Sequence, residues 1–290
     1  MKNSIFSIKV LSYCVLVRPK QWVKNVLLFA APFAAGITFT YDTTTKLVSG
    51  FMIFSFIASL GYVTNDWIDR KNDALNASKS HRPFAKGDLK VIDFVVVNLL
   101  LILLILAFAK FVPLDFLFCI YVYFVNTLLY SLGLKHVPVV EMVMLTFGFL
   151  LRPLAGAALL GLPVSEHFLI VVIFGSLFII ATKRLSELQK YPKQHARKVV
   201  LRYSVSFLES VITLAITLCL TAYFLWALGT YPDSVWVKAS LFPMLTGLLR
   251  YSWMRGLENA ESPEHLIFQD YVIPLCGIVV IVLLAVPIYG

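Results

Sequence analysis

Long apolar runs recur along the whole chain, and they are continuous rather than alternating with polar positions. We count nine, at residues 22–40, 47–65, 91–110, 112–131, 139–160, 167–183, 205–229, 235–254 and 270–288. A bilayer core about 30 Å thick is crossed by roughly 17–25 residues of α-helix, whereas the strands of a membrane barrel alternate. The pattern therefore predicts an all-α polytopic membrane protein, with nine transmembrane helices in a single domain over residues 1–290.

The composition excludes an ordinary soluble domain. Hydrophobic residues make up 59% of the chain and charged residues 14%, whereas a typical soluble domain is roughly 45–50% apolar. The mean hydropathy of +0.83 agrees with this. The four cysteines lie in or beside the apolar runs without the spacing of zinc ligands, so we interpret them as small apolar side chains.

The formal net charge of +9 is distributed unevenly along the chain. If the N-terminus is cytoplasmic, 21 of the 25 Lys and Arg residues lie on the cytoplasmic side, only Lys46, Lys110 and Lys238 lie outside, and Arg152 lies within a run. Short cytoplasmic loops of membrane proteins carry such an excess of positive charge. The charge thus indicates topology rather than nucleic-acid binding, with the N-terminus inside and the C-terminus outside.

The second apolar run ends in NDWIDRKND, residues 65–73. If its helix continues, Asn65, Asp69 and Asp73 fall on one side at positions i, i+4 and i+8, with Asp66 alongside. Mg²⁺ prefers hard oxygen ligands and is commonly held by one or two carboxylates together with substrate phosphates. The segment therefore predicts a Mg²⁺ site made by these four residues.

Basic residues follow the acidic segment. Lys79 and Arg82 are close enough in sequence to contact the diphosphate that the metal would bind. The alternative is a solvated helix end whose aspartates pair with Arg70 and Lys71. Four ligand-type side chains within nine residues, facing a bilayer, favour metal and diphosphate.

A second, mainly cationic cluster follows the sixth run and contains Lys183, Arg184 and Glu187. The second and sixth runs cross the membrane in the same direction, so both clusters are expected on the cytoplasmic face. Arg and Lys side chains there would bind the anionic part of a metal-bound substrate. For residues 190–202 we favour instead an amphipathic turn lying among anionic lipid headgroups.

Arg152 lies some 13 residues into the fifth run, which is about 20 Å along a helix. An arginine at this depth is costly unless it faces a polar cavity or a partner, so we interpret it as a substrate-binding residue. An ion pair with Glu141 or Glu209 is the alternative.

Other polar residues flank the runs and are candidates for the rim of a substrate cavity. They are Lys24, Asn25, Lys135 and Tyr203.

The N-D-x-x-D-x-x-x-D pattern of residues 65–73, the YSLGLK turn before the fifth run and the nine runs resemble the UbiA superfamily of intramembrane prenyltransferases. The resemblance implies a Mg²⁺-diphosphate substrate, two acidic motifs and a cavity that opens sideways to lipid. After the sixth run, however, this chain has KRLSEL in place of a second aspartate-rich motif. With RPKQWVKN at 18–25, RPLAGAALLGLPVS at 152–165 and SPEHLIFQD at 262–270, the chain is similar to the decaprenyl-phosphate phosphoribosyltransferase branch.

This branch implies a Mg²⁺-dependent pentosyltransferase of the bacterial plasma membrane, with a cytoplasmic active site, that serves cell-envelope pentose synthesis. The phosphate of a polyprenyl phosphate attacks C1 of phosphoribosyl diphosphate (PRPP), and diphosphate leaves. Asp66, Asp69 and Asp73 would be catalytic through Mg²⁺. The remaining assignments are Lys79, Arg82, Lys183 and Arg184 for the phosphates of the donor, and Arg152 or Lys24 for the lipid phosphate.

Two other functions are weighed against this one. An aromatic prenyltransferase would use a polyprenyl diphosphate donor, and the absence of a second acidic motif argues against it. A transporter would carry charges near the membrane midplane, whereas these clusters lie at one face. The sequence leaves the lipid chain length open, and it decides neither for nor against a homo-oligomer.

Overall fold

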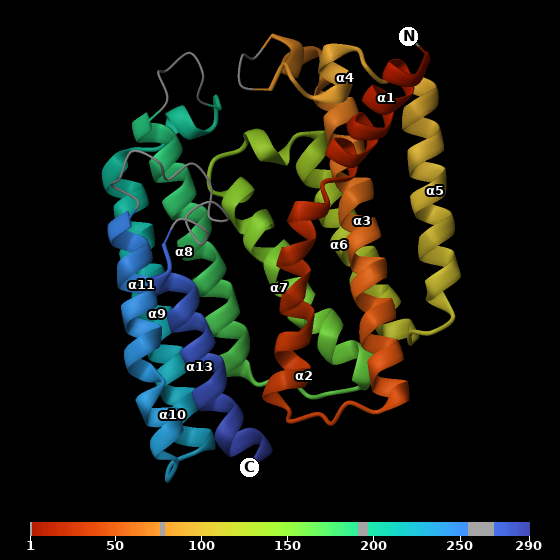
Figure 1. Ribbon diagram of the computed structural model, residues 1–290. Helices are drawn as coiled ribbons and strands as arrows, with labels where there is room; N and C mark the ends of the chain where they lie inside the picture. The colour runs from red at the N-terminus through yellow and green to blue at the C-terminus, as the bar shows by residue number, and fades with distance from the viewer. Residues whose placement is uncertain (1, 76–78, 191–196, 255–269) are drawn as a thin grey trace. The chain divides into compact units, whose positions relative to one another are not determined.

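A computed structural model describes residues 2–75, 79–190, 197–254 and 270–290. Every regular element in these ranges is a helix, as predicted (Figure 1). The chain divides into two compact units. Unit 1 is Met1–Phe33, Ile37–Val137 and Leu151–Pro163, and unit 2 is Ala34–Gly36, Pro138–Leu150 and Val164–Gly290. That residues 1–290 form a single domain stays a prediction.

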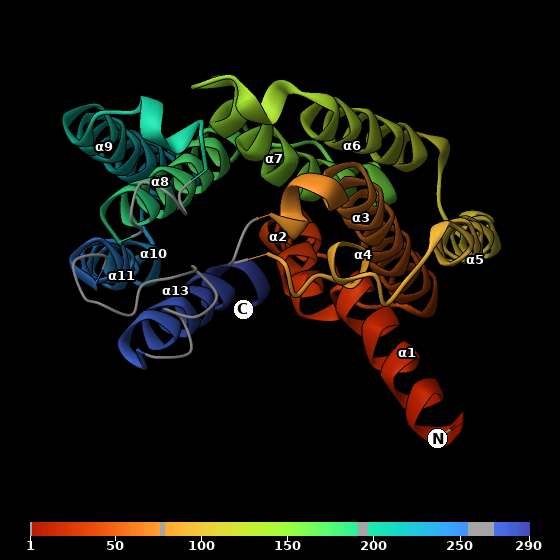
Figure 2. The ribbon, with the colours of Figure 1, turned by 90° about the horizontal axis from the view of Figure 1, so that it is seen from above.

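Unit 1 is built around one long helix. Its elements are α1 (Lys2–Val17), the 3₁₀ helix η1 (Pro19–Phe29), α2 (Ala30–Ala34, shared with unit 2), α3 (Tyr41–Ala74), α4 (Pro83–Lys86), α5 (Val91–Ala109), α6 (Leu114–Leu132), η2 (Leu134–His136) and the second half of α7 (Val140–Leu160). A capping box between Thr40 and Thr43 starts α3, which runs for 34 residues without a break. Helix α3 packs against α1, η1, α5 and α6, and α5 lies beside it at the margin of the unit (Figures 1 and 2).

The core of unit 1 forms on opposite sides of α3. One cluster includes Phe54, Phe116 and Leu151, and another includes Phe56 and Val63. The 3₁₀ helix η1 approaches α7 closely, because a Cβ on Gly156 would lie only 1.8 Å from the carbonyl oxygen of Leu28. Glycine at this position is therefore required for the contact.

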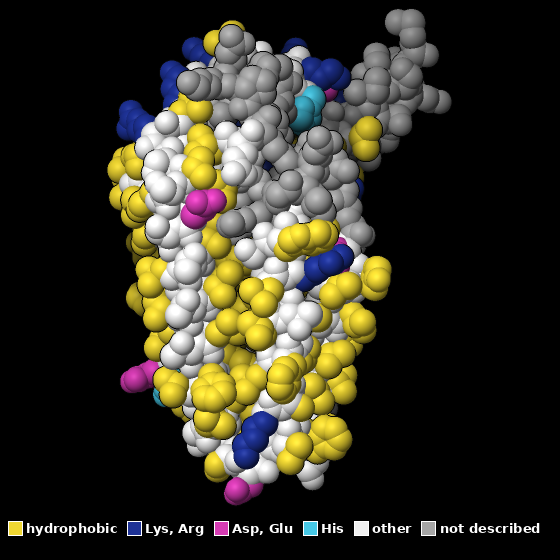
Figure 3. Space-filling model, turned by 90° about the vertical axis from the view of Figure 1, so that its left-hand side faces the viewer, with side chains coloured by type: hydrophobic (Ala, Val, Ile, Leu, Met, Phe, Trp, Pro, Cys, Tyr) yellow, Lys and Arg dark blue, Asp and Glu magenta, His cyan; other side chains and the backbone are white. Residues whose placement is uncertain are grey.

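Unit 2 contains the first part of α7, α8 (Glu166–Lys190), η3 (Val200–Arg202), α9 (Val205–Thr230), α10 (Val235–Ala239), α11 (Leu241–Met254) and α13 (Val272–Tyr289). Helices α8 and α9 pack along each other, and α11 packs against α13. Their core includes Met142, Phe178, Leu208 and Tyr251. Hydrophobic side chains also spread over the outer face drawn in Figure 3, as expected for helices in contact with lipid.

Seven helices in the described residues are long and apolar enough to span a membrane, so the chain is a multi-span membrane protein. They are α3, α5, α6, α7, α8, α9 and α13. The predicted count of nine is not confirmed, because two predicted runs are not single helices. Residues 22–40 comprise most of η1, the short α2 and an irregular stretch, and residues 235–254 are divided at Ser240. Pro243 contributes to the second break, since it has no N–H with which to continue the hydrogen bonding of α10.

Candidate functional site

The acidic segment forms the last turns of α3, as the sequence predicts. Asn65, Asp66, Asp69 and Asp73 all lie within the helix, which ends at Ala74. Asp66 is 2% exposed and Asp73 is 3% exposed. Buried carboxylates at these exposures require charged or hydrogen-bonding partners.

Two arginines hold Asp66. Nη2 of Arg18 donates to both carboxylate oxygens at 2.7 Å. Nη1 of Arg82 donates to Oδ1 of Asp66 and to Oδ2 of Asp73, at 2.8 Å each. Arg82 is the residue that precedes α4, so the short helix after the loop returns its side chain to α3.

Lysines complete the cluster. Nζ of Lys135, on η2, lies 2.6 Å from both oxygens of Asp69 and 3.0 Å from Oδ1 of Asn65. Nζ of Lys79 lies 3.7 Å from Oδ1 of Asp73. Lys135 was predicted only as a rim residue, and the structure places it directly on the acidic segment.

The alternative pairing with the basic residues of α3 itself is wrong for Arg70. Its Nη1 donates to the carbonyl oxygen of Trp67 at 2.6 Å, and its guanidinium lies over the Trp67 ring. Lys71 is exposed. The aspartates thus take their cations from the junction of α1 and η1, from η2 and from the loop before α4.

The oxygen ligands of this cluster suit Mg²⁺ by their chemistry. One Arg82 nitrogen is shared by Asp66 and Asp73, so a single cation can lie within reach of both carboxylates. In the described part of the chain, however, no three His, Cys, Asp or Glu side chains are grouped closely enough to hold a metal ion. The types of donor atom suit Mg²⁺, but to hold the ion the carboxylates would have to move closer together and release basic side chains.

Arg152 is 4% exposed and lies in the part of α7 that belongs to unit 1. Its Nε donates to Oδ1 of Asn25 at 3.0 Å, and its Nη2 donates to the Tyr123 hydroxyl at 3.3 Å. The guanidinium also faces the rings of Phe54 and Tyr123, at 5.3 and 5.2 Å from their centroids. These neutral groups solvate a buried cation and link α7 to η1 and α6.

A second buried network lies in unit 2. Nε and Nη2 of Arg184 donate to the two oxygens of Glu141 at 2.7 and 2.6 Å, and Nη1 donates to Glu187 at 3.1 Å. Arg184 is 2% exposed and Glu141 is fully buried. Glu141, considered above as a partner of Arg152, therefore pairs with Arg184, while Glu209 is exposed on α9. That Arg184 binds a substrate phosphate stays a prediction.

Tyr203 extends this network to a strained turn. Its hydroxyl accepts a hydrogen bond from the Val139 N–H at 2.7 Å and lies 3.4 Å from Oε1 of Glu141. Val139 has a positive φ of 66°, which is rare for a β-branched residue. Burial raises the pKa of the Tyr203 phenol, with the Glu141 carboxylate adding to the increase and the Val139 N–H opposing it.

The remaining predicted residues divide between the units. Lys24 is half-buried on η1 in unit 1, and Lys183 is half-buried on α8 in unit 2. Most of the SPEHLIFQD stretch and residues 191–196 of the predicted surface turn lie outside the described residues.

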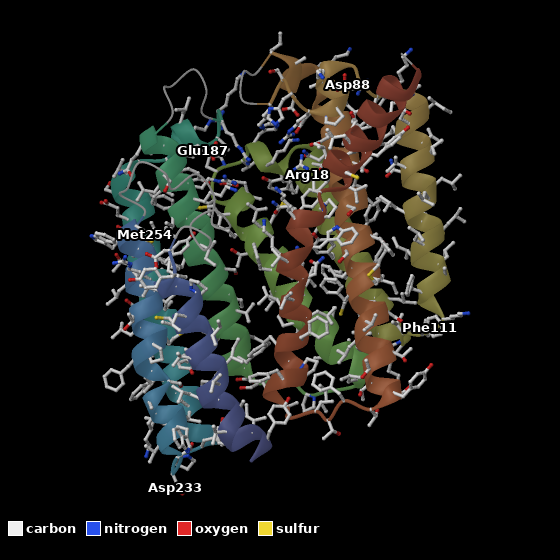
Figure 4. All side chains as sticks on the ribbon, in the orientation of Figure 1. Arg18, Asp88, Phe111, Glu187, Asp233 and Met254 are labelled. Carbon is white, nitrogen blue, oxygen red and sulfur yellow. The ribbon has the colours of Figure 1, made fainter. Side chains whose placement is uncertain are left out.

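Sequence reasoning missed the role of Arg18, which lies at the junction of α1 and η1 (Figure 4). It also missed Tyr123 as a partner of Arg152. The one available signal for Arg18 was that it begins the RPKQWVKN stretch used for the resemblance. Nothing in the local pattern connects it to Asp66, 48 residues away.

These observations define a multi-span helical membrane protein with an acidic segment surrounded by basic side chains. The sequence pattern of the UbiA prenyltransferase family matches residues 26–270. The chain therefore belongs to the UbiA prenyltransferase family and is a transferase.

Its curated relatives include decaprenyl-phosphate phosphoribosyltransferases. The enzyme of Mycobacterium tuberculosis is 34% identical over 270 residues, which cover 90% of this chain and 89% of the relative. That of Corynebacterium glutamicum is 32% identical over 283 residues, covering 94% and 85%. Similarity to these relatives thus extends over nearly the full length of both chains.

Solved structures show the same fold. A UbiA homolog from Archaeoglobus fulgidus bound to GPP and Mg²⁺ superposes with a TM-score of 0.71, covers 96% of this chain and 99% of its own, and is 17% identical. The DMAPP and Mg²⁺ complex of a UbiA homolog from the same organism gives a TM-score of 0.71 at 19% identity, with the same coverage of both chains. At these identities the likeness establishes the fold.

Proposed function

We propose that this chain transfers the 5-phosphoribosyl group from PRPP to a polyprenyl phosphate of the decaprenyl type and releases diphosphate. The observation that carries the proposal is the concentration of four basic side chains on three carboxylates at the end of α3. Such a site suits a polyanion that arrives with a divalent metal. The relatives in M. tuberculosis and C. glutamicum are named as phosphoribosyltransferases that act on decaprenyl phosphate, which supports a phosphoribosyl donor; we propose PRPP as that donor.

Mg²⁺ is the proposed cofactor, and Asn65, Asp66, Asp69 and Asp73 would hold it. When bound, it would neutralise negative charge on the diphosphate as that group leaves. Lys79, Arg82 and Lys135 would bind and orient the diphosphate oxygens, since their nitrogens already surround the carboxylates. In unit 2, Lys183 and Arg184 are proposed to bind donor phosphate, with Glu187 and Tyr203 completing the substrate-binding set.

The chemistry of the transfer explains why no catalytic base is required. The bond from C1 of the ribose to the diphosphate oxygen breaks, and a new bond forms between C1 and an oxygen of the lipid phosphate. Glycosyl transfer of this kind proceeds through an oxocarbenium-like state, so stabilising the leaving group is the main demand. The lipid phosphate is anionic at neutral pH and attacks without losing a proton to the protein.

The lipid phosphate is assigned to Lys24 or Arg152. Arg152 is nearly fully buried and donates to Asn25 and Tyr123, whereas Lys24 is half-buried on η1. This difference favours Lys24 as the first contact, with Arg152 holding η1 in place through Asn25.

The proposed setting is the bacterial plasma membrane, with the N-terminus and the site on the cytoplasmic side and the C-terminus outside. The product would serve the synthesis of pentose precursors for the cell envelope. The tail of the lipid would lie among the apolar helices, in a cavity open to the bilayer of the kind that the resemblance to the UbiA superfamily implies.

The test is a comparison of substrates with the purified protein in detergent. We expect radiolabel to pass from PRPP to a long-chain polyprenyl phosphate in the presence of Mg²⁺, and EDTA to stop the transfer. If the protein ignores PRPP and instead joins a prenyl diphosphate to an aromatic acid such as 4-hydroxybenzoate, the proposal is wrong.

A further inference from the structure

Arg18 has an unusual backbone conformation where α1 ends and η1 begins. Its φ of 55° and ψ of 57° lie in the left-handed region, which residues with a Cβ disfavour. Its guanidinium nevertheless forms two hydrogen bonds with Asp66 and lies 5.0 Å from the centroid of the Tyr62 ring. The Arg18 side chain is 27% exposed while that of Asp66 is 2% exposed, so the arginine reaches solvent from a buried carboxylate.

All the carboxylate oxygens of the acidic segment already face a cation. Each of the six oxygens of Asp66, Asp69 and Asp73 lies within 3.7 Å of a Lys or Arg nitrogen. In the described part of the chain, four cations face these three carboxylates, which leaves a formal surplus of one positive charge. A divalent metal arriving alone would therefore meet a positively charged cluster and would have to displace basic side chains.

A diphosphate arriving without metal would have to compete with the carboxylates for the basic side chains. The arginine and lysine nitrogens that suit its oxygens are directed at carboxylates. When metal and diphosphate arrive together, the metal can take the carboxylates and the diphosphate can take the released cations. Arginine is well suited to this exchange, because its planar fork of donors matches carboxylate and phosphate oxygens alike.

We infer that Arg18 is a diphosphate-binding residue that exchanges Asp66 for the diphosphate, so that metal and diphosphate bind to the site as a pair. The identity of the donor as PRPP rests on the proposed function. The exchange itself involves only a divalent cation and the diphosphate group. Thermodynamic linkage requires each ligand to raise the affinity for the other by the same factor.

The first experiment measures this coupling on the full chain in detergent, with Mn²⁺ and inorganic diphosphate as probes. Electron paramagnetic resonance gives the Mn²⁺ affinity with and without diphosphate, and calorimetry gives the diphosphate affinity with and without Mn²⁺. We expect each ligand to strengthen binding of the other about 10-fold or more. Equal Mn²⁺ affinities with and without diphosphate would overturn the inference.

Substitution of Arg18 distinguishes the exchange from a purely structural role, in which Arg18 only holds Asp66 in place. In Arg18→Gln, Asp66 loses one of its two cations, so Mn²⁺ alone should bind about 10-fold more tightly, while diphosphate in the presence of Mn²⁺ should bind about 10-fold more weakly. Arg18→Lys keeps the charge and should keep the weak binding of Mn²⁺ alone. Arg250→Gln removes an arginine paired with Asp270 at 2.9 Å in unit 2, and it should change neither affinity.

A purely structural role for Arg18 predicts the opposite change in the affinity for Mn²⁺ alone. If Arg18 only supports Asp66, Arg18→Gln should weaken Mn²⁺ alone as well as diphosphate, and that result would also overturn the inference. Neither readout requires turnover. Paired binding without transfer from PRPP would retain the exchange and reject the proposed function, whereas transfer without paired binding would do the reverse.

Discussion

At the scale of single residues, Asp69 and Asp73 show how the carboxylates of the acidic segment are paired inside a membrane protein. Each carboxylate is held by a basic side chain that comes from a different part of unit 1, Lys135 for Asp69 and Arg82 for Asp73. Removing one carboxylate therefore leaves a cation with one partner fewer. It also removes a ligand charge that the proposed Mg²⁺ requires.

Asp69→Asn and Asp73→Asn are each expected to lower turnover about 100-fold or more, because an amide keeps the shape of the side chain but loses the charge that positions the metal. The measurement is transfer from PRPP at saturating lipid, together with the amount of folded protein recovered from membranes. Asp42→Asn is the matched control, because Asp42 lies on the same helix and pairs with Lys46 at 2.7 Å on the exposed end. Near-normal turnover in both site variants would reject the metal assignment.

At the scale of the elements, the pair between Arg184 and Glu141 joins α7 to α8 inside unit 2. Truncating one partner of a buried ion pair costs about 3–5 kcal/mol, since the other charge is left without compensation. Arg184→Ala is thus expected to lower the thermal midpoint in detergent strongly, and Arg184→Ala with Glu141→Ala is expected to lower it less. If the double variant is the less stable one, the pair does not have this role.

The turn before α7 gives a second prediction at this scale. Tyr203→Phe removes the hydroxyl that accepts from the Val139 N–H, which leaves a strained residue without its support. Loss of a buried partner of this kind costs about 1–3 kcal/mol. We expect a lower midpoint of thermal unfolding in detergent than for Tyr121→Phe, a control on an exposed position of α6. Equal midpoints for the two variants would show that the hydroxyl is dispensable.

At the scale of the whole molecule, hydrophobic runs predicted the helices because apolar length is what a bilayer demands. They could not predict the 3₁₀ helix η1 or the break at Ser240, since hydropathy does not record how the backbone is hydrogen-bonded. The spacing of Asn65, Asp69 and Asp73 predicted one side of a helix correctly. The pairs Arg18–Asp66 and Arg184–Glu141 were not predicted, because the two residues of each pair lie 48 and 43 positions apart and no local period connects such positions.

The predicted topology places the two ends of unit 2 on opposite sides of the membrane. Glu187 and Asp233, labelled in Figure 4, mark these ends. In a variant without the four native cysteines, Leu201→Cys should react with an impermeant thiol reagent only from the cytoplasm, and Asp233→Cys only from outside; both positions are exposed. The reverse labelling would place the basic loops outside and contradict the positive-inside assignment.

The central claim is that the ribose leaves its diphosphate and joins the lipid together with its 5-phosphate. The most direct measurement uses PRPP that carries separate labels in the ribose carbon, the 5-phosphate and the diphosphate, with the purified chain, Mg²⁺ and a polyprenyl phosphate. We predict that ribose and 5-phosphate labels enter the lipid in equal amounts, while the diphosphate label stays in the aqueous phase. Diphosphate label in the lipid, or a lipid that gains no ribose, would contradict the account.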